Sequence, residues 1–123
     1  MILLEVSDVN SQAIEAVLDS VLFYIVLDWN DSGAYWSMGI RNSAYQNIID
    51  GISVSANYPL TKQFRYADMP SGELFVSSSD YRSGPVPRDG FATGRYELIY
   101  VTQEDLIAGG FMDFIGRTQL DVV

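Results

Sequence analysis

Residues 12–29 form a nearly continuous apolar stretch that is interrupted chiefly by Asp19-Ser20. The second half of the stretch, Val21 to Trp29, is rich in β-branched and aromatic residues and is bounded by turn formers, a pattern typical of a strand. Since its apolar residues do not alternate with polar ones, we expect this strand to be buried on both faces. The stretch therefore favours a core built from β-sheet.

The first half of the stretch has two interpretations. One is the apolar stripe of a helix that begins after Ser11, which fits the spacing of Ile14, Val17, Leu18 and Val21. Residues 13–18 fit equally well the first strand of a hairpin that turns at the Asp19-Ser20 dipeptide. The residues themselves leave both interpretations open.

A second hairpin is expected around the turn signal Asn30 to Gly33. Residues 35–41 alternate after it, with Trp36, Met38 and Ile40 on one face, as in a half-buried antiparallel strand. Trp29 and Trp36 are spaced so that their strands can pair across this turn. Further strands are expected over residues 47–55 and 95–101, with a bend or bulge at Asp50-Gly51. The chain from Tyr58 to Tyr66 is expected to be irregular or a short helix, and residues 69–76 to form a turn that feeds a short strand.

Three other segments differ from strands in composition. Residues 77–94 are rich in serine, glycine and proline and are expected to form a long loop without core residues. Thr102 opens the pattern of a capping box, which predicts one helical turn over Gln103 to Ala108. The tail that follows is apolar, so we expect it to dock on its own domain or on a neighbour.

These features define a single domain with two appendages. We expect an N-terminal arm over residues 1–10, a β-domain over residues 11–108 and an apolar C-terminal tail over residues 109–123. The expected fold class is all-β, either a small antiparallel β-barrel or a rolled β-sandwich, with one short helix.

The composition excludes several classes of function. The chain has no cysteine and no histidine, so it has neither the thiolate nor the imidazole that zinc fingers, cysteine nucleophiles and Ser-His-Asp triads require. Sixteen acidic against seven basic residues give a net charge of −9, which argues against binding to nucleic acid or to anionic membranes. No signal peptide or membrane span is recognisable, and we expect the chain to be cytosolic when it is synthesised.

Carboxylate pairs are the remaining acid–base chemistry. Asp28 with Asp31, Asp50 with Glu73, and Glu104 with Asp105 are candidates. Such pairs arise by chance in an acidic chain, and we interpret them as solvated surface groups. The segment from Asp28 to Gly33 resembles a calcium loop but lacks the terminal glutamate, so a hairpin turn is preferred. We expect no catalytic residues, no cofactor and no metal.

The aromatic residues have a core and a surface interpretation. Eight tyrosines and two tryptophans could line a carbohydrate- or peptide-binding module, although aromatic residues at strand positions more often fill a core. The expected structural core anchors are Trp29, Trp36, Tyr24, Phe75 and Tyr100. The expected interface residues lie in the 77–94 loop and the tail: Ser79, Tyr81, Pro85, Arg88, Phe91, Phe111, Phe114 and Ile115.

Several segments, in order, carry a family resemblance. They are Tyr24 to Asn30, the turn ending at Gly33, Tyr35 to Ile40, Ile49-Asp50-Gly51, Leu60 to Tyr66, Met69-Pro70-Ser71-Gly72-Glu73-Leu74-Phe75-Val76, and Pro87-Arg88-Asp89-Gly90 ahead of Leu98-Ile99-Tyr100. Together they resemble the baseplate plug proteins of contractile-tailed phages, typified by the plug of a small cyanophage. The resemblance covers about residues 11–106 and favours the hairpin over the helix for residues 13–18. The apolar extension beyond Leu106 has no counterpart in the family.

The resemblance implies a structural role. Members of this family are virion proteins of the baseplate hub or the tip of the tail tube, so we expect a plug or hub component that acts by subunit packing in the phage tail baseplate. The implied partners are other baseplate, hub and tail-tube proteins, and symmetric copies of the chain itself around the tail axis, in three or six copies. The family implies no enzymatic activity.

Overall fold

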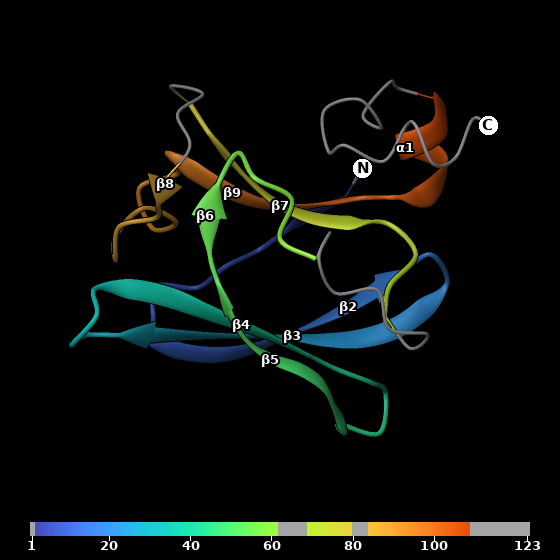
Figure 1. Cartoon of the computed structure of the whole chain (residues 1–123), viewed down its shortest axis with the longest axis horizontal. Coiled ribbons are helices and arrows are strands. Elements are labelled where there is room, and N and C mark those ends of the chain that lie inside the picture. Colours follow the sequence, from blue (N-terminus) through green and yellow to red (C-terminus); the bar gives the residue numbers. More distant parts are fainter. Residues whose placement is uncertain (1, 62–68, 80–83, 109–123) are drawn as a thin grey trace.

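The computed structural model describes residues 2–61, 69–79 and 84–108 and contains two facing β-sheets (Figure 1). One sheet has four strands in the order β2-β3-β4-β5, and the other has five in the order β1-β9-β7-β6-β8. The predicted all-β class is confirmed. The sheets do not close into a barrel, so the two-sheet alternative is the one that forms.

The four-stranded sheet is an antiparallel meander made from two tight hairpins. β2 (Ser11–Leu18) pairs with β3 (Val21–Asn30) across Asp19 and Ser20, whose φ angles of 51° and 68° are those of a type I′ turn. This confirms the hairpin and excludes the helix for residues 13–18. β4 (Tyr35–Arg41) follows, and Trp29 lies directly opposite Trp36 as predicted.

The bulge predicted at Asp50-Gly51 is confirmed in β5 (Asn47–Ser53). Met38 pairs with Ile52 and Ile40 with Ile49, so β5 holds one residue more than β4 over this stretch. Gly51 has a φ of 72°, a conformation that glycine adopts without steric cost.

The prediction that the 21–29 strand is buried on both faces is wrong. Phe23, Ile25 and Leu27 are buried, whereas Tyr24 and Val26 between them are only half-buried. The reason is that the five-stranded sheet covers just one face of the four-stranded sheet. Apolar side chains on the other face are shielded only by their neighbours on the same sheet.

The five-stranded sheet collects strands from both ends of the chain. Its longest strands are β7 (Glu73–Ser78) and β9 (Tyr96–Val101), which pair antiparallel, and β1 (Ile2–Leu4) pairs with the other edge of β9. The short strands β6 (Ser55–Ala56) and β8 (Gly84–Pro85) complete it. β6 runs parallel to β7, which departs from the purely antiparallel arrangement that we expected.

A continuous segment connects the two sheets, which share one core. The chain leaves β5 at Ser53, passes through the buried Val54 and enters β6 in the opposite sheet (Figure 1). The inward side chains of both sheets then meet in one hydrophobic cluster, to which Trp36, Met38, Val76 and Tyr100 each contribute a fully buried side chain. Burial of such large apolar groups is the main favourable term in folding.

The prediction that residues 77–94 form a loop without core residues is wrong. Ser77 and Ser78 belong to β7, and Val86 and Phe91 are buried members of the core. The part from Gly84 to Gly94 folds over one end of the gap between the sheets, on the left in Figure 1. Because it closes the core there, the side chains of Val86 and Phe91 point inward.

The segments at the two ends of the β-domain have defined positions. Residues 2–4, expected as part of an arm, form the edge strand β1, with Leu4 buried. The predicted helix is α1 (Gln103–Ala108), and the backbone amide of Asp105 donates to the Thr102 hydroxyl at 3.1 Å, which confirms the N-cap. The tail over residues 109–123 lies outside the described residues.

Candidate interaction surfaces

The five expected core anchors occupy different environments. Trp36 and Tyr100 are fully buried, and Trp29 packs against the core with its ring edge-on to Trp36 at 5.4 Å between centroids. Phe75 on β7 and Tyr24 on β3 are only half-buried. Tyr24 lies on the outer face of its sheet, so it cannot contribute to the core between the sheets.

Four of the expected interface residues fall within the described chain. Ser79 and Pro85 are exposed, the first directly after β7 and the second within β8. Tyr81, Phe111, Phe114 and Ile115 lie outside the described residues. The remaining two, Arg88 and Phe91, are engaged within the domain.

Arg88 links the closing segment, Gly84 to Gly94, to the chain that leads into β2. Its Nη1 lies 2.9 Å from Oδ1 of Asp8, and its Nε donates to Oδ1 of Asn10 at 2.5 Å. The guanidinium also lies over the Trp36 ring, 5.5 Å from the centroid. These contacts hold two segments about eighty residues apart, so the Arg88 guanidinium already has partners in the isolated domain.

The placement of Phe91 corrects its expected role at an interface. Its ring is 9 % exposed and lies edge-on to Trp36, with 5.7 Å between centroids. The Trp36 indole N–H also donates to the carbonyl oxygen of Pro87 at 3.2 Å. The segment therefore uses Phe91 to fill the end of the core.

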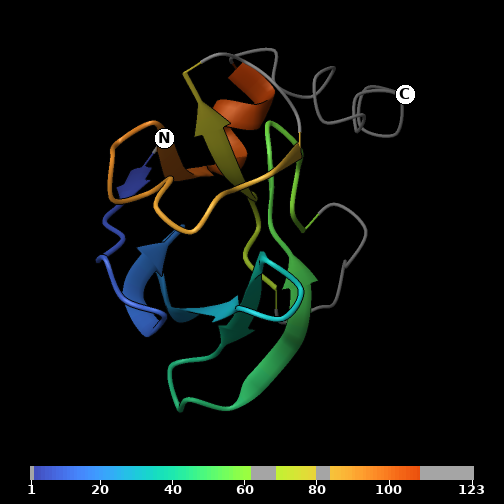
Figure 2. The same cartoon turned by 90° about the vertical axis from the view of Figure 1, so that its left-hand side faces the viewer.

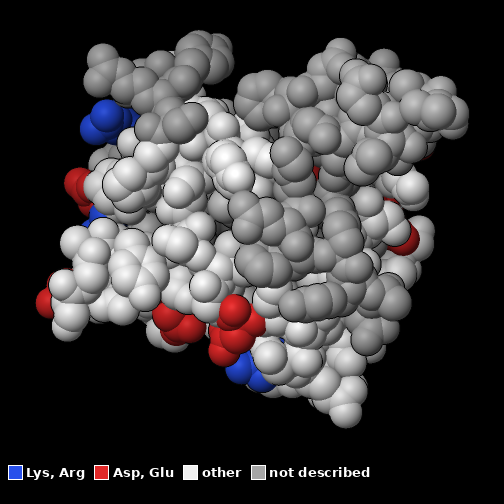
Figure 3. Space-filling model, viewed as in Figure 1, with Lys and Arg blue, Asp and Glu red and all other residues white. Residues whose placement is uncertain are grey.

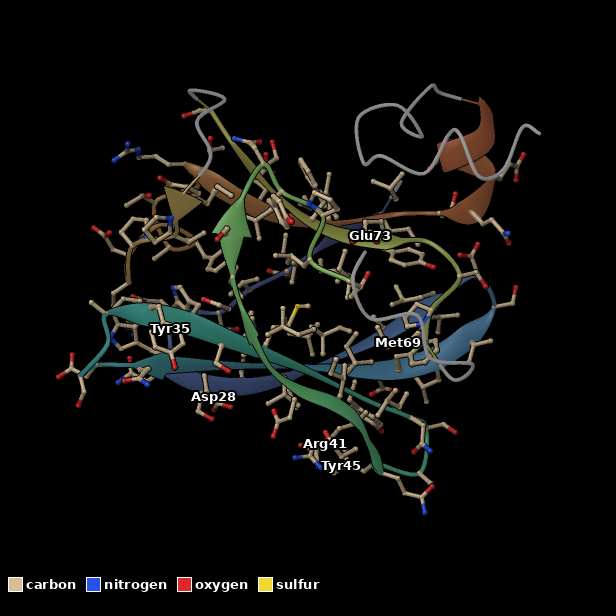
Figure 4. All side chains as sticks on the ribbon, in the orientation of Figure 1. Asp28, Tyr35, Arg41, Tyr45, Met69 and Glu73 are labelled. Carbon is tan, nitrogen blue, oxygen red and sulfur yellow. The ribbon has the colours of Figure 1, made fainter. Side chains whose placement is uncertain are left out.

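A surface cluster that sequence reasoning missed lies on the outer face of the four-stranded sheet. The rings of Tyr24 and Tyr45 meet edge-on at 5.0 Å, and the Arg41 guanidinium lies 4.8 Å from the centre of the Tyr45 ring. Figure 4 shows Arg41 and Tyr45 together on the side of this sheet that faces away from the five-stranded sheet. Hydrogen bonds within the turn, including one from the Tyr45 amide to the Asn42 carbonyl, hold Tyr45 at a φ of 62°.

Exposed apolar side chains gather near two strand edges. Leu3 on β1 is 61 % exposed, and Val17 on β2 and Val21 at the start of β3 are 59 % and 52 % exposed. Figure 2 shows β1 and β2 on the same side of the molecule. Exposed apolar groups beside open strand edges are typical of surfaces that pair with another chain.

The candidate carboxylate pairs are dispersed or engaged in structural contacts. Asp28 accepts a hydrogen bond from the Ser11 hydroxyl across the β2–β3 ladder, and Asp31 accepts one from the Trp29 indole. Asp50 and Glu73 belong to different sheets. Figure 3 shows acidic side chains along the lower rim of one face, over the four-stranded sheet.

Glu73 is a buried carboxylate with a structural role. It is 1 % exposed, and its two oxygens accept hydrogen bonds from the amide and the hydroxyl of Thr61, at 2.7 and 2.9 Å. Figure 4 shows it beside the five-stranded sheet. No group of three or more acidic side chains suited to a metal ion occurs in the described part of the chain.

The described helical residues contain no segment with the length and apolarity needed to cross a bilayer. No match to a curated protein was found.

A family model described as the cyanophage baseplate Pam3 plug gp18 matches residues 1–104, which include every strand of both sheets. The match begins at the first residue. It therefore includes residues 1–10, which we expected to form an arm that the family resemblance does not cover. The chain therefore belongs to the cyanophage baseplate plug family, whose members are structural components of the phage baseplate.

Proposed function

We propose that this chain is a plug or hub component at the distal end of the tail tube in a contractile phage tail. It acts by packing against neighbouring subunits and has no enzymatic activity. The observation that supports this proposal is the family match, which spans both sheets and the segment that closes the core. The partners are baseplate, hub and tail-tube proteins, together with symmetric copies of the chain around the tail axis in three or six copies.

The surface chemistry supports assembly by packing. Exposed apolar side chains near the edges of β1 and β2 leave hydrophobic area that another subunit can cover. A net charge of −9 disfavours contact with the packaged genome, since phosphates require cationic partners. The chain would therefore contact proteins of the tail.

The alternative of a carbohydrate- or peptide-binding module requires several exposed tyrosines on one concave face. Tyr45 and Tyr58 are the two most exposed among the described tyrosines. Tyr45 lies in the turn between β4 and β5, whereas Tyr58 follows β6 in the other sheet. Since Tyr45 lies next to the four-stranded sheet and Tyr58 next to the five-stranded sheet, they do not favour the binding module over the baseplate role.

The proposal is tested by locating the chain in purified phage particles. We expect mass spectrometry to find it in the virion and electron cryomicroscopy to place it at the distal end of the tail tube. Density in the sheath or the capsid, with none at the tube end, would contradict the proposal.

A truncated chain tests the role of the C-terminal tail. The notable apolar content of Phe111 to Val123 suggests that this segment contacts a neighbour. We expect a chain without these residues to fold as a monomer, with the circular dichroism of a β-protein, and to be incorporated poorly into particles. Unfolding of the truncated chain would show that the tail belongs to its own core.

A further inference from the structure

The two sheets together have four edges within the described residues, and three of them carry features that discourage pairing with another strand. β1 has three residues, and β8 has two residues and contains Pro85. β5 is interrupted by the bulge at Asp50-Gly51. Short edges, prolines and bulges are the devices by which β-proteins protect their edges.

The fourth edge, β2, has none of these features. It is eight residues long and pairs with β3 without interruption, from Ser11 opposite Asp28 to Leu18 opposite Val21. β2 contains no proline and no lysine, and β3 is its one strand partner in the described chain. In an antiparallel strand, every second residue directs its N–H and C=O away from a given neighbour. Those groups make β2 a regular template for an added strand.

The side chains of β2 define what an added strand would contact. Ala13, Glu15 and Val17 point to the outer face and are exposed, with Val17 at 59 %. Ile14 points inward but is only half-buried, although its neighbours toward the turn, Ala16 and Leu18, are buried. An added strand would therefore cover apolar side chains on both faces and would meet one carboxylate between two apolar groups.

The charges near this edge identify the kind of partner. β2 and β3 contain Glu15 and Asp28 and no basic residue, while Glu5, Asp8 and Asp19 flank them along the chain. Asp8 is already paired with Arg88. A second copy paired antiparallel through this edge would add the same acidic residues and no cation, with Glu15 directly opposite Glu15 in one register, and like charges opposite each other are destabilising. The edge therefore suits a different protein that carries cations.

We propose that β2 receives an extended segment of another baseplate protein. That segment has Lys or Arg opposite Glu15 and apolar residues two positions away on either side, opposite Ala13 and Val17. Main-chain hydrogen bonds to β2 hold the segment, and the alternating side chains select it. The choice of a baseplate neighbour rests on the proposed function.

Photo-cross-linking in assembled particles tests this assignment. A photoreactive phenylalanine derivative replaces Val17 in the full chain or, as the matched control, Ser53, which is exposed on the opposite edge of the same sheet. We expect position 17 to cross-link to one segment of a different protein, with Lys or Arg two residues from the cross-linked position. Position 53 should not reach that segment. Cross-links from position 17 to another copy of this chain, or none in particles that contain it, would overturn the inference.

Charge substitutions give an independent measurement. When each variant is co-expressed with the wild-type chain, Glu15→Lys should lower incorporation into particles about fivefold and Ser53→Lys should leave it unchanged. Replacing the basic residue of the cross-linked segment by an acidic one should restore the incorporation of Glu15→Lys. The strand addition would be contradicted if Glu15→Lys did not lower incorporation and the second replacement did not raise it. Particles that lack the chain altogether would instead overturn the proposed function, so mass spectrometry of the particles separates the two failures.

Discussion

The hydroxyl group of Tyr100 on β9 donates a hydrogen bond to the carboxylate of Asp19, the first residue of the β2–β3 turn, at 2.5 Å. The same oxygen accepts a hydrogen bond from the backbone N–H of Gly72 at 2.6 Å. A Cβ at position 72 would lie 2.1 Å from the carbonyl oxygen of Val101, so only glycine allows this approach. One buried tyrosine thus links the two sheets and the segment that precedes β7.

Replacement of Tyr100 by phenylalanine should lower the free energy of unfolding by about 1–3 kcal/mol, because the buried N–H of Gly72 loses its acceptor. The ring remains, so the packing loss is small. Urea unfolding followed by fluorescence measures the change. Tyr96→Phe on the same strand is the control, since Tyr96 is half-buried, and should cost less than about 0.5 kcal/mol. Equal midpoints for the two variants would show that the Tyr100 hydroxyl adds no stability.

Loss of the Phe91 ring should release the segment that closes the core. Phe91→Ala removes the edge-on contact with Trp36 and should cost about 3 kcal/mol or more. Hydrogen exchange of the backbone amides between Val86 and Gly94 should become faster at the same time.

Arg88→Ala is the comparison for this prediction, because it changes the same segment but removes the contacts of the guanidinium with Asp8, Asn10 and the Trp36 ring and leaves the Phe91 ring in place. It should cost about 1 kcal/mol or less, as expected for an exposed ion pair. A larger loss for Arg88→Ala than for Phe91→Ala would mean that charged contacts, and not apolar packing, hold the closing segment.

Local turn chemistry made the second hairpin of the four-stranded sheet predictable, whereas residues 13–18 fitted a helix or a strand and only the family resemblance favoured the strand. The Asp19-Ser20 dipeptide and the Asn30–Gly33 segment are close in sequence to the strands that they join. The turn lengths therefore determined the register, including Trp29 opposite Trp36. The Asp50-Gly51 bulge was predictable for a similar reason, because glycine inside a strand pattern indicates a local irregularity.

The burial of Val86 and Phe91 was not predictable from the composition of the 77–94 segment. Its position depends on contacts such as the one from the Trp36 indole to Pro87, which are 51 residues apart. Serine, glycine and proline indicate an irregular backbone, but they do not indicate whether the apolar residues among them point inward. The half-buried outer face of β3 was missed for a related reason: Tyr24 and Val26 have the same apolar character whether a second sheet covers them or not.

The outer cluster of Tyr24, Arg41 and Tyr45 had only a partial signal in the sequence. Pairing of Tyr24 with Arg41 follows from the register of the second hairpin. Tyr45 lies in a turn and has a left-handed φ. The spacing of hydrophobic residues in a sequence does not indicate such a position. The open edge of β2 was equally hidden, since edge and central strands are distinguished only when the whole sheet is assembled.

Removal of the Glu73 carboxylate should destabilise the fold strongly. Glu73→Ala leaves the buried amide and hydroxyl of Thr61 without their acceptor, and we expect a loss of about 2–4 kcal/mol. Glu97→Ala on the neighbouring strand β9 makes the same change at an exposed position and should cost less than about 0.5 kcal/mol. Thermal and urea unfolding measure both losses. Similar losses in the two variants would contradict a structural role for the buried carboxylate.

Replacement of Ser20 by glycine should stabilise the protein. Ser20 has a φ of 68° at the second position of the type I′ turn, a conformation that is unfavourable for residues with a Cβ and free of that cost in glycine. We expect a gain of about 0.5–1 kcal/mol in the free energy of unfolding by urea. The same change at Ser43, an exposed turn residue without a positive φ, should be neutral or destabilising, because glycine there only adds freedom to the unfolded chain. A loss of stability in Ser20→Gly would show that the serine side chain stabilises the turn by more than the backbone strain costs.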